Sequence, residues 1–325
     1  MLTDKDLDDI EVTFMDITRA LSQDRAIKAV TGMSIAEFKS LAEKFERVYE
    51  MKRIKVYEEE VMSGKRKRQL GGGRKGKLDN TYKRLFFILF YLKCYPTFDL
   101  LALLFGMHRA NSYRNVQKLL PVIRETLEGE MVLPKRKIRS LEELFEIYPE
   151  SEEIFIDAVE RSIQRPKDKK KQREFYSGKK KRHTQKNTII TNKKRRILYL
   201  GPTVEGKKHD YKAFKEEFPS STLSAGLLEA FSVYADLGYL GIEKEYPLLK
   251  IKMPKKKPKG KELTLQERME NRKISSVRIK VEHAISGIKR FGIIWGVLRN
   301  RKEGFGDKVM EIACGLWNYH LSKAN

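Results

Sequence analysis

Apolar positions near the end of the chain recur with the period of an α-helix. Between residues 274 and 289 they repeat every three or four residues, as in a helix buried on one side: Ile274, Val277, Val281, Ile285 and Ile288. A charged stripe runs beside the apolar one, because spacings of four and seven residues place Arg278, Glu282 and Lys289 within roughly 40° of one another. Taken alone, Arg278 and Glu282 fit an ordinary ion pair one helical turn apart.

Two apolar runs have the composition of buried strands, and each brings in one aspartate. Asp157 interrupts the run 154–160, where an acid is costly unless it is paired, binds a metal or lies at the exposed end of the strand. Asp236 follows a strand of about five residues within 231–241 and precedes two glycines, which is where α/β sheets tend to build sites. With Glu282, the two aspartates form a candidate set of three carboxylates.

The pattern of the first third of the chain predicts helices. Ser34 with Glu37 makes a capping box for a helix that continues to about Met51, with one apolar face made by Phe38, Leu41, Phe45 and Val48. Asp79 or Asn80 is the expected N-cap of a helix that runs to about Lys93. A second short helix is expected from Phe98 to Phe105 and a third from Arg109 to about Leu120.

The last two of these helices have the spacing of a helix-turn-helix unit. Ala102 and Gly106 occupy the positions where small residues let the helices approach and the chain turn. Ser112 and Asn115 stand where apolar residues are more usual, so Tyr113 and Val116 are expected to pack instead. A third helix in the major groove of DNA would present Arg109, Asn111 and Arg114 to the bases. A helical hairpin with no role in DNA binding is the alternative.

Composition favours a polyanionic partner. The 325 residues include 68 Lys and Arg against 44 Asp and Glu, which gives a net charge of +24. Fifteen of the basic residues lie within 165–196 and seven lysines within 250–261, and a further basic, glycine-rich segment at 65–77 has the composition of a flexible arm. The block nearest Asp157 is expected to follow the phosphate backbone of DNA through Lys179, Lys180, Lys181 and Arg182.

The length of the chain and its remaining residues limit the classes of protein and the division into domains that can be expected. Two single cysteines argue against a zinc site or a disulfide framework, and no apolar stretch has the length of a membrane span. An intracellular, cytoplasmic protein is expected. Acidic residues gather before residue 12 and suggest packing or self-association there. The expected parts are helices over 1–63, a basic linker over 64–78, a helix-turn-helix domain over 79–132, a linker over 133–150 and an α/β domain over 151–325.

Four segments resemble the DDE transposases of bacterial insertion sequences, in the group distantly akin to eukaryotic Harbinger elements. They are DAVERSIQRPKD (157–168), YSGKKKRHTQK (176–186), DLGYLG (236–241) and RIKVEHAISGIKRF (278–291), and the resemblance covers about residues 80–320. The family signature of Arg, three residues, Glu, six residues and Lys fits Arg278, Glu282 and Lys289 without a gap. Many relatives carry Tyr where this chain has Ser275, which puts in doubt the DNA contact that the Tyr would make.

This resemblance implies a ribonuclease-H-like fold, in which helices flank a mixed sheet, with Asp157 and Asp236 on strands and Glu282 on a helix. Three carboxylates suit two Mg²⁺ ions, with Mn²⁺ as a substitute. Two such ions promote an in-line displacement at phosphorus, in which an attacking oxygen replaces a leaving oxygen. The implied reaction is cleavage of double-stranded DNA at the transposon ends and transfer of the 3′ end to target DNA, by a homo-oligomer that is expected to be a dimer. Arg278 and Lys289 are expected to support the site.

Two other functions and one local alternative stay open at this point. A DNA-binding protein that has lost catalysis would keep the same fold, and a metal-dependent endonuclease would share the site without strand transfer. His209 and Asp210 could lie near the metals, but Asp210 is expected instead to be the N-cap of a helix that starts at Tyr211.

Overall fold

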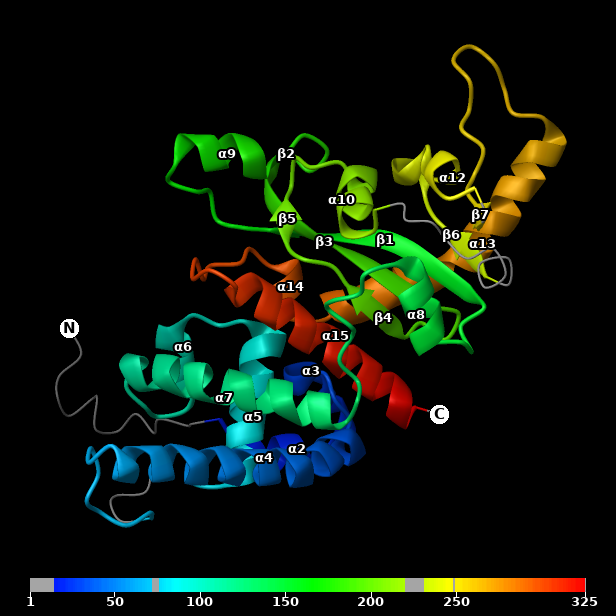
Figure 1. Cartoon of the computed structure of the whole chain (residues 1–325). Helices are drawn as coiled ribbons and strands as arrows, with labels where there is room; N and C mark the ends of the chain where they lie inside the picture. Colours follow the sequence, from blue (N-terminus) through cyan, green and yellow to red (C-terminus); the bar gives the residue numbers. More distant parts are fainter. Residues whose placement is uncertain (1–14, 72–75, 220–230, 248, 325) are drawn as a thin grey trace. The chain divides into compact units, whose positions relative to one another are not determined.

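The computed structural model describes residues 15–71, 76–219, 231–247 and 249–324, and the chain divides into two compact units at residue 129. Figure 1 shows helices alone in the first unit, and a sheet with flanking helices in the second. No helix among the described residues is both long and apolar enough to cross a membrane. The acidic stretch before residue 12 lies outside the described residues, as do the four central residues of the glycine-rich arm.

The first unit contains six helices in its described part, and most follow the sequence pattern. They are α2 (Ile17–Ser22), α3 (Asp24–Thr31), α4 (Ile35–Met62), α5 (Thr81–Cys94), α6 (Phe98–Leu104) and α7 (Arg109–Gly129). The capping box of α4 is confirmed, because Glu37 N–H donates to Ser34 Oγ at 3.2 Å and Ser34 N–H donates to Glu37 Oε2 at 2.7 Å. The helix ends at Met62, well beyond the expected end near Met51.

The three helices α5, α6 and α7 form the predicted helix-turn-helix region. Asn80 caps α5, and Gly106 has a φ of +59°, which lets the chain turn between α6 and α7. Val116 packs as predicted and is fully buried, whereas Tyr113 packs only in part: its ring makes an edge contact with Phe98, and 43% of its surface stays exposed. Ser112 is fully buried, because its small side chain fits where neighbouring helices come close. The helix α7 also continues past Leu120 to Gly129.

The second unit is built on a mixed sheet of seven described strands. Its long strands are β1 (Glu153–Ser162) and β3 (Arg182–Asn192), which are antiparallel neighbours, and β6 (Ser232–Tyr234) and β7 (Lys250–Lys252) follow on the other side of β1 in parallel. The short strands β2 (Tyr176–Ser177), β4 (Ile197–Leu200) and β5 (Val204–Glu205) all pair with β3. The strand β6 has three residues, where about five were expected.

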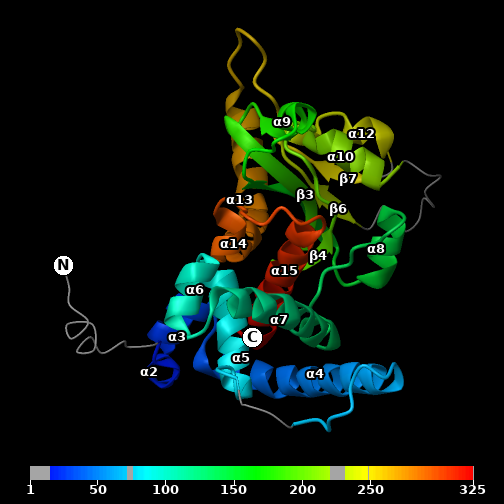
Figure 2. The ribbon, with the colours of Figure 1, turned by 90° about the vertical axis from the view of Figure 1, so that its left-hand side faces the viewer.

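Helices cover both faces of this sheet (Figure 2). One layer contains α8 (Leu141–Ile147), α10 (Asp210–Glu217), the 3₁₀ turn η1 (Leu237–Tyr239) and α12 (Ile242–Glu245), which share a core with Ile154, Ile156 and Val233. The other layer contains α13 (Leu265–Lys289), α14 (Gly292–Trp295) and α15 (Phe305–Lys323), which contact β1 and β4. The short helix α9 (Lys169–Phe175) precedes β2.

The segment 133–150, expected to be a linker, packs into the second unit. Ile138, Leu141, Leu144 and Phe145 are buried in the core of the α10 layer, and the Phe145 ring stacks on Phe231 with centroids 3.8 Å apart. Burying these apolar side chains stabilises the sheet, at roughly 25 cal/mol per Å² of area removed from water. The sheet domain therefore begins before residue 151.

Candidate active site

The two aspartates predicted from the strand pattern meet because their strands are parallel neighbours. Phe155 of β1 lies opposite Tyr234 of β6, and each strand reaches its aspartate two residues later. The strand β6 stops at Tyr234, whereas β1 continues, so the edge of β1 lies open beside Asp157. Asp236 lies just after β6 and is the N-cap of η1, because its Oδ1 accepts a hydrogen bond of 2.8 Å from Gly238 N–H. Asp157 and Asp236 line one hollow of about 390 Å³.

The carboxylate of Asp157 is destabilised where it lies. Its pKa is raised to about 6, chiefly by burial and to a smaller extent by the negative charges of Asp236 and Asp210. A hydrogen bond from Ala158 N–H, at 2.7 Å, and the guanidinium of Arg278 lower it. Arg278 lies 4.0 Å from Asp157 Oδ2, which is too far for a close ion pair. The ionised form of Asp157 is therefore disfavoured chiefly by burial, and Arg278 compensates its charge only in part.

Asp210 belongs to this hollow, contrary to the prediction. The N-cap of α10 is His209, and Asp210 is the first residue of the helix, so its carboxylate is free to turn toward the sheet. Lys186 of β3 donates to Asp210 Oδ1 at 2.8 Å, and both residues line the hollow with His209. The charge of Asp210 is thus compensated by a close partner, unlike that of Asp157.

The charged stripe of α13 reaches the hollow only in part. Arg278 faces Asp157, and Lys289 lines the hollow, where burial and the charge of Lys180 lower the pKa of its ammonium group. Glu282 lies one helical turn after Arg278 but is exposed and does not line the hollow. Among the described residues, no three side chains of His, Cys, Asp or Glu are grouped closely enough to hold a metal ion.

The basic residues expected near the site lie at its rim. Lys179 and Lys180 line the hollow, while Lys181 and Arg182 follow in the turn that leads into β3, and all four are exposed. Lys181 has a φ of +54°, and its N–H donates to Ser177 O at 2.8 Å, which makes the turn tight. This segment therefore presents a row of cations at the mouth of the carboxylate hollow.

Two further residues of the hollow were not singled out in the sequence. Glu160 lies on β1 opposite Lys186 of β3, and its carboxylate accepts a hydrogen bond of 2.5 Å from Thr184 Oγ1. Glu160 gave no clear signal, because a spacing of three residues in a strand ordinarily places two side chains on opposite faces of the sheet. Lys186 gave none either, because it is one of the fifteen Lys and Arg residues of a basic block.

The residues expected to read DNA bases are exposed at the start of α7. Arg109 Nε lies 3.3 Å from Asp99, and Arg114 donates to Asn111 Oδ1 at 2.8 Å. All three predicted side chains, Arg109, Asn111 and Arg114, are open to solvent. Their neighbours fix their directions without burying them.

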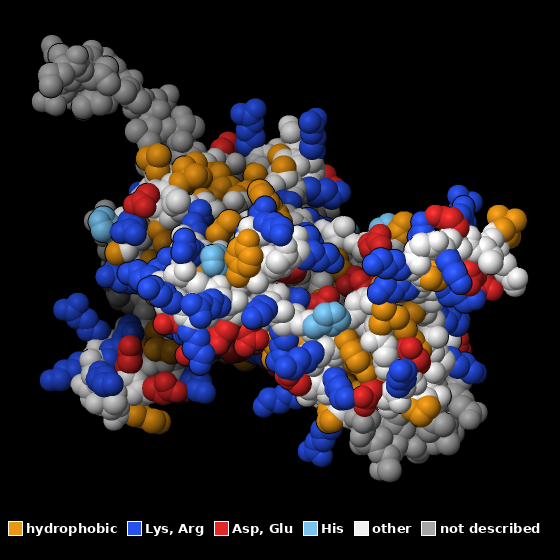
Figure 3. All heavy atoms as spheres, turned by 90° about the horizontal axis from the view of Figure 1, so that it is seen from above, with side chains coloured by type: hydrophobic (Ala, Val, Ile, Leu, Met, Phe, Trp, Pro, Cys, Tyr) orange, Lys and Arg blue, Asp and Glu red, His pale blue; other side chains and the backbone are white. Residues whose placement is uncertain are grey.

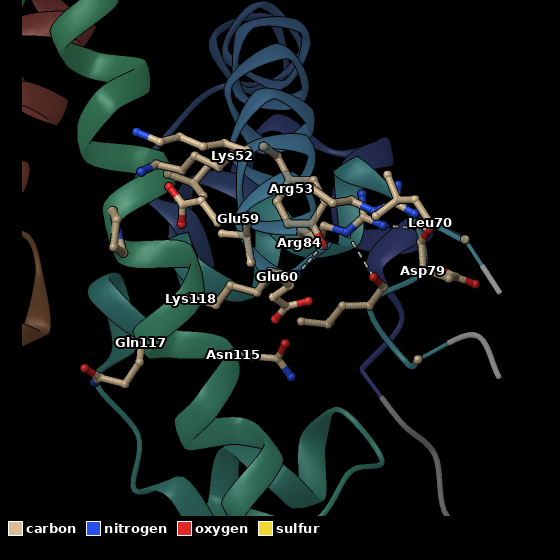
Figure 4. Close-up of a pocket in the computed structure, with 18 of the residues that line it drawn as sticks. Lys52, Arg53, Glu59, Glu60, Leu70, Asp79, Arg84, Asn115, Gln117 and Lys118 are labelled. Carbon is tan, nitrogen blue, oxygen red and sulfur yellow. Dashed lines mark hydrogen bonds between the residues drawn. The ribbon is translucent and has the colours of Figure 1, made fainter. Parts of the chain in front are cut away.

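The first unit also contains a hollow of about 910 Å³ beside Tyr49, with seven Lys or Arg and three acids in its lining (Figure 4). The unit's own groups bind several of these cations. Lys118 donates to the Tyr49 hydroxyl at 2.8 Å, the Arg84 guanidinium lies 4.3 Å from the centre of the Tyr49 ring, and Lys52 pairs with Glu125 at 2.5 Å. These contacts connect α4, α5 and α7, so the hollow's charges stabilise the helical unit.

A carboxylate hollow rimmed by lysines, on a chain that also carries a helix-turn-helix, defines a class of enzyme that cuts nucleic acid. Comparison with known proteins agrees. A family model described as DDE superfamily endonuclease matches residues 156–318, and one described as helix-turn-helix of DDE superfamily endonuclease matches residues 76–129. No solved structure matches the chain significantly.

A relative from Microchaete diplosiphon, described as a probable transposase for insertion sequence element IS702, is 32% identical over 293 residues. The match covers 89% of this chain and 99% of the relative. The chain therefore belongs to the DDE transposases of insertion sequences that carry an N-terminal helix-turn-helix, which confirms the family resemblance seen in the sequence.

Proposed function

We propose that the chain binds the terminal inverted repeats of its insertion sequence and catalyses metal-dependent cleavage of the DNA strand, followed by strand transfer. The observation that carries this proposal is the position of Asp157 and Asp236, two residues beyond the last paired residues of adjacent parallel strands and inside one hollow. The lysines at the rim of the same hollow supply the charge that a DNA phosphate requires.

The side chains present fit a divalent metal. Their donors are carboxylate oxygens, which hard cations prefer, and a bound cation would offset the charge of Asp157, which burial disfavours and Arg278 compensates only in part. Asp157 and Asp236, which line the hollow, would hold Mg²⁺, or Mn²⁺ in its place. Glu282 is assigned as the third ligand of a two-ion site by the family signature alone, because it lies outside the hollow. When bound, these ions would supply positive charge to the attacking and leaving oxygens of the phosphate.

The neighbouring cations act on the carboxylates and on the DNA. The guanidinium of Arg278, 4.0 Å from Asp157 Oδ2, partly offsets the charge of that carboxylate. Lys289 lines the hollow with its ammonium group and contacts a DNA phosphate. Lys186 neutralises Asp210, which leaves Asp210 less suited to a metal than its two neighbours.

The catalytic unit is best described as ribonuclease-H-like. Three features support this assignment: a mixed sheet between two helical layers, one aspartate within β1 and another just after the adjacent parallel strand β6, and a glutamate on a covering helix. Each insertion sequence has two ends to cut, so we further propose that the active form is a homo-oligomer with at least two such units.

The direct test is a cleavage assay on a plasmid that carries the insertion sequence with its flanks. We expect Mg²⁺-dependent nicks at the element's ends that leave 3′ hydroxyls, then joining of those ends to a second plasmid. Cutting without joining would identify an endonuclease instead. DNA binding without Mg²⁺-dependent cutting would identify a protein that has lost catalysis.

A second test separates the two proposed DNA-binding surfaces. Arg109→Ala or Arg114→Ala should reduce the preference for end DNA over scrambled DNA by about 1–3 kcal/mol, because base contacts specify sequence. Neutralising Lys179, Lys180 and Lys181 together should weaken binding to both DNAs and flatten its salt dependence, because fewer phosphates are contacted. Affinities at several salt concentrations measure both effects, and the opposite outcome would show that the roles are reversed.

A further inference from the structure

A second hollow of the catalytic unit, of about 840 Å³, lies beside α9 and the turn between β2 and β3. None of the eight described residues that line it is an acid, and four are exposed cations: Arg165, Lys169, Arg173 and Lys207. Figure 3 shows Lys and Arg side chains crowded over this part of the surface. We refer to it as the cation hollow. Its charge contrasts with that of the hollow beside Tyr49, where acids lie among the cations.

The cation hollow is partly organised before any ligand binds. Arg165 donates to Gln172 Oε1 from Nε at 3.1 Å and from Nη2 at 2.8 Å, and the Gln172 amide donates to Pro166 O at 2.9 Å. Gln172 is neutral, so it fixes the direction of the guanidinium without cancelling its charge. A planar cation held in this way is suited to bind an anion such as phosphate.

Aromatic rings lie among these cations. Tyr176 is 43% exposed, and its ring makes an edge-to-face contact with His183, with centroids 5.6 Å apart and planes at 73°. This contact fixes the tyrosine ring while much of its surface stays open. Cations that follow a phosphate backbone, combined with exposed rings on which bases stack, are the features by which proteins bind single-stranded nucleic acid.

The cation hollow adjoins the carboxylate hollow, since Gly178 and Lys207 line both. The shared wall is held firmly. The Lys207 N–H donates to Glu174 O at 3.1 Å, and Gly206 packs so closely that an added Cβ would lie 2.0 Å from Thr184 Oγ1. A DNA strand with its scissile phosphate beside Asp157 therefore has a fixed, positively charged path into the cation hollow.

We propose that the cation hollow binds an unpaired segment of the DNA strand next to the scissile phosphate. Arg165, Lys169, Arg173 and Lys207 bind its phosphates, and a base stacks on Tyr176. A duplex would use the cations but would conceal the faces of its bases, and the exposed ring would then contribute nothing. This inference rests on the proposed function, because it assigns the strand that the carboxylate hollow cuts.

The first experiment measures binding of the full chain to a labelled oligothymidine of about ten nucleotides and to a duplex, in chelator, by fluorescence anisotropy. Tyr176→Ala should weaken oligothymidine binding roughly 5- to 100-fold, the equivalent of one lost base stack, with little change for the duplex. Tyr82→Ala is the matched control, because Tyr82 is equally exposed at 43% and contacts the ring of Phe38.

Charge is tested with Lys169→Gln combined with Arg173→Gln. We expect weaker binding of oligothymidine and a shallower salt dependence than with the control pair Lys170→Gln and Lys171→Gln, which lie on the same helix outside the hollow. The proposal is wrong if the two double variants reduce oligothymidine affinity equally, or if Tyr176→Ala and Tyr82→Ala do so. It is also wrong if Tyr176→Ala weakens binding of oligothymidine and of the duplex by the same factor.

Cleavage connects this result to the carboxylate hollow. Tyr176→Ala should cut a fully paired end slowly and recover when the bases next to the cleavage position are left unpaired, because the strand no longer has to be separated. Slow cutting of both substrates would contradict the proposed strand path. The proposed function is tested separately from this inference. It is wrong if the wild type and Asp157→Asn cut DNA equally, or if neither cuts, whatever the oligothymidine binding shows.

Discussion

Asp157 and Glu217 are both buried carboxylates with raised pKa values, but their surroundings differ. Burial raises the pKa of Asp157 to about 6 and that of Glu217 to about 7. Asp157 borders an open hollow shared with other carboxylates and several lysines. Glu217 accepts a hydrogen bond of 2.8 Å from Thr188 Oγ1 and packs against Gly201.

The difference shows that a raised pKa by itself does not identify a catalytic group. Burial is the largest cause for both acids, so the shift reports the loss of water around them. What distinguishes Asp157 is that its neighbours include Asp236 and Asp210, and that the space beside them is open to a ligand. A cation can reach Asp157 from the hollow, whereas Glu217 lies outside it, with one oxygen bonded to Thr188 and the other enclosed without a hydrogen-bond partner among the described residues.

The largest expected contrast is in cleavage. Asp157→Asn, Asp236→Asn and Glu282→Gln should each reduce cutting by roughly a thousandfold or more, because each removes a carboxylate that is proposed to hold the metal ions. Glu217→Gln makes the same chemical change at the enclosed acid and should cut at nearly the normal rate. DNA affinity, measured alongside, should change little in all four. Normal cutting by any of the first three would remove that residue from the site.

Most of this site was predictable from the sequence where its determinants are local. A buried strand interrupted by Asp157, an acid before glycines at Asp236, and the spacing of Arg278 and Lys289 are patterns within a few residues. Asp210 was misassigned because its partner Lys186 lies 24 residues away, and only the sheet brings the two together. A local rule for helix caps had no access to that contact.

The fold shows the same limit. The capping box of α4 and the N-cap of α5 depend on residues three positions apart, and both were predicted correctly. Whether Ser112 or Tyr113 becomes buried depends on which side of α7 meets its neighbours. The segment 133–150 was taken as a linker because the residues that it packs against lie far along the chain. Tertiary contacts, and not propensity, decided these cases.

The next contrast is in stability against pH, measured by urea unfolding in chelator. Both acids have folded pKa values above their unfolded ones of 3.8 and 4.5, so ionisation opposes folding. The free energy of unfolding should therefore fall as pH rises from the unfolded pKa of each acid to its folded pKa, which is about 6 for Asp157 and about 7 for Glu217. The expected loss is on the order of 2–3 kcal/mol for each acid.

The two contributions separate by mutation and by metal. Asp157→Asn and Glu217→Gln should each remove part of the pH dependence. Mg²⁺ at neutral pH should stabilise the wild type and Glu217→Gln but have much less effect on Asp157→Asn, because only the open hollow can take the ion. Equal stabilisation of all three proteins by Mg²⁺ would show that the ion binds elsewhere.

Two glycines sharpen the contrast further. An added Cβ at Gly201 would lie 2.2 Å from Glu217 Oε2, and one at Gly238 would lie 2.8 Å from Asp236 Oδ1. Gly201→Ala should therefore lower the free energy of unfolding by about 1–3 kcal/mol and leave cleavage intact in the folded protein. Gly238→Ala should instead slow cleavage, by about tenfold, with a smaller loss of stability. The reverse pattern would mean that the enclosed acid takes part in the chemistry.

The smallest expected effect concerns the lysine on α13 that lines the open hollow. Lys289 is exposed and lines the hollow that contains Asp157, and we propose that its charge holds a DNA phosphate and does not act on the reacting atoms. Lys289→Ala should therefore raise the DNA concentration that half-saturates cleavage several-fold, about 1 kcal/mol, and lower the maximal rate much less. Lys212→Ala, an exposed lysine of α10 outside the hollow, is the control. A large fall in maximal rate at unchanged DNA requirement would instead place Lys289 at the reacting phosphate, and a lower urea midpoint with normal kinetics would make it a structural counterion of Asp157.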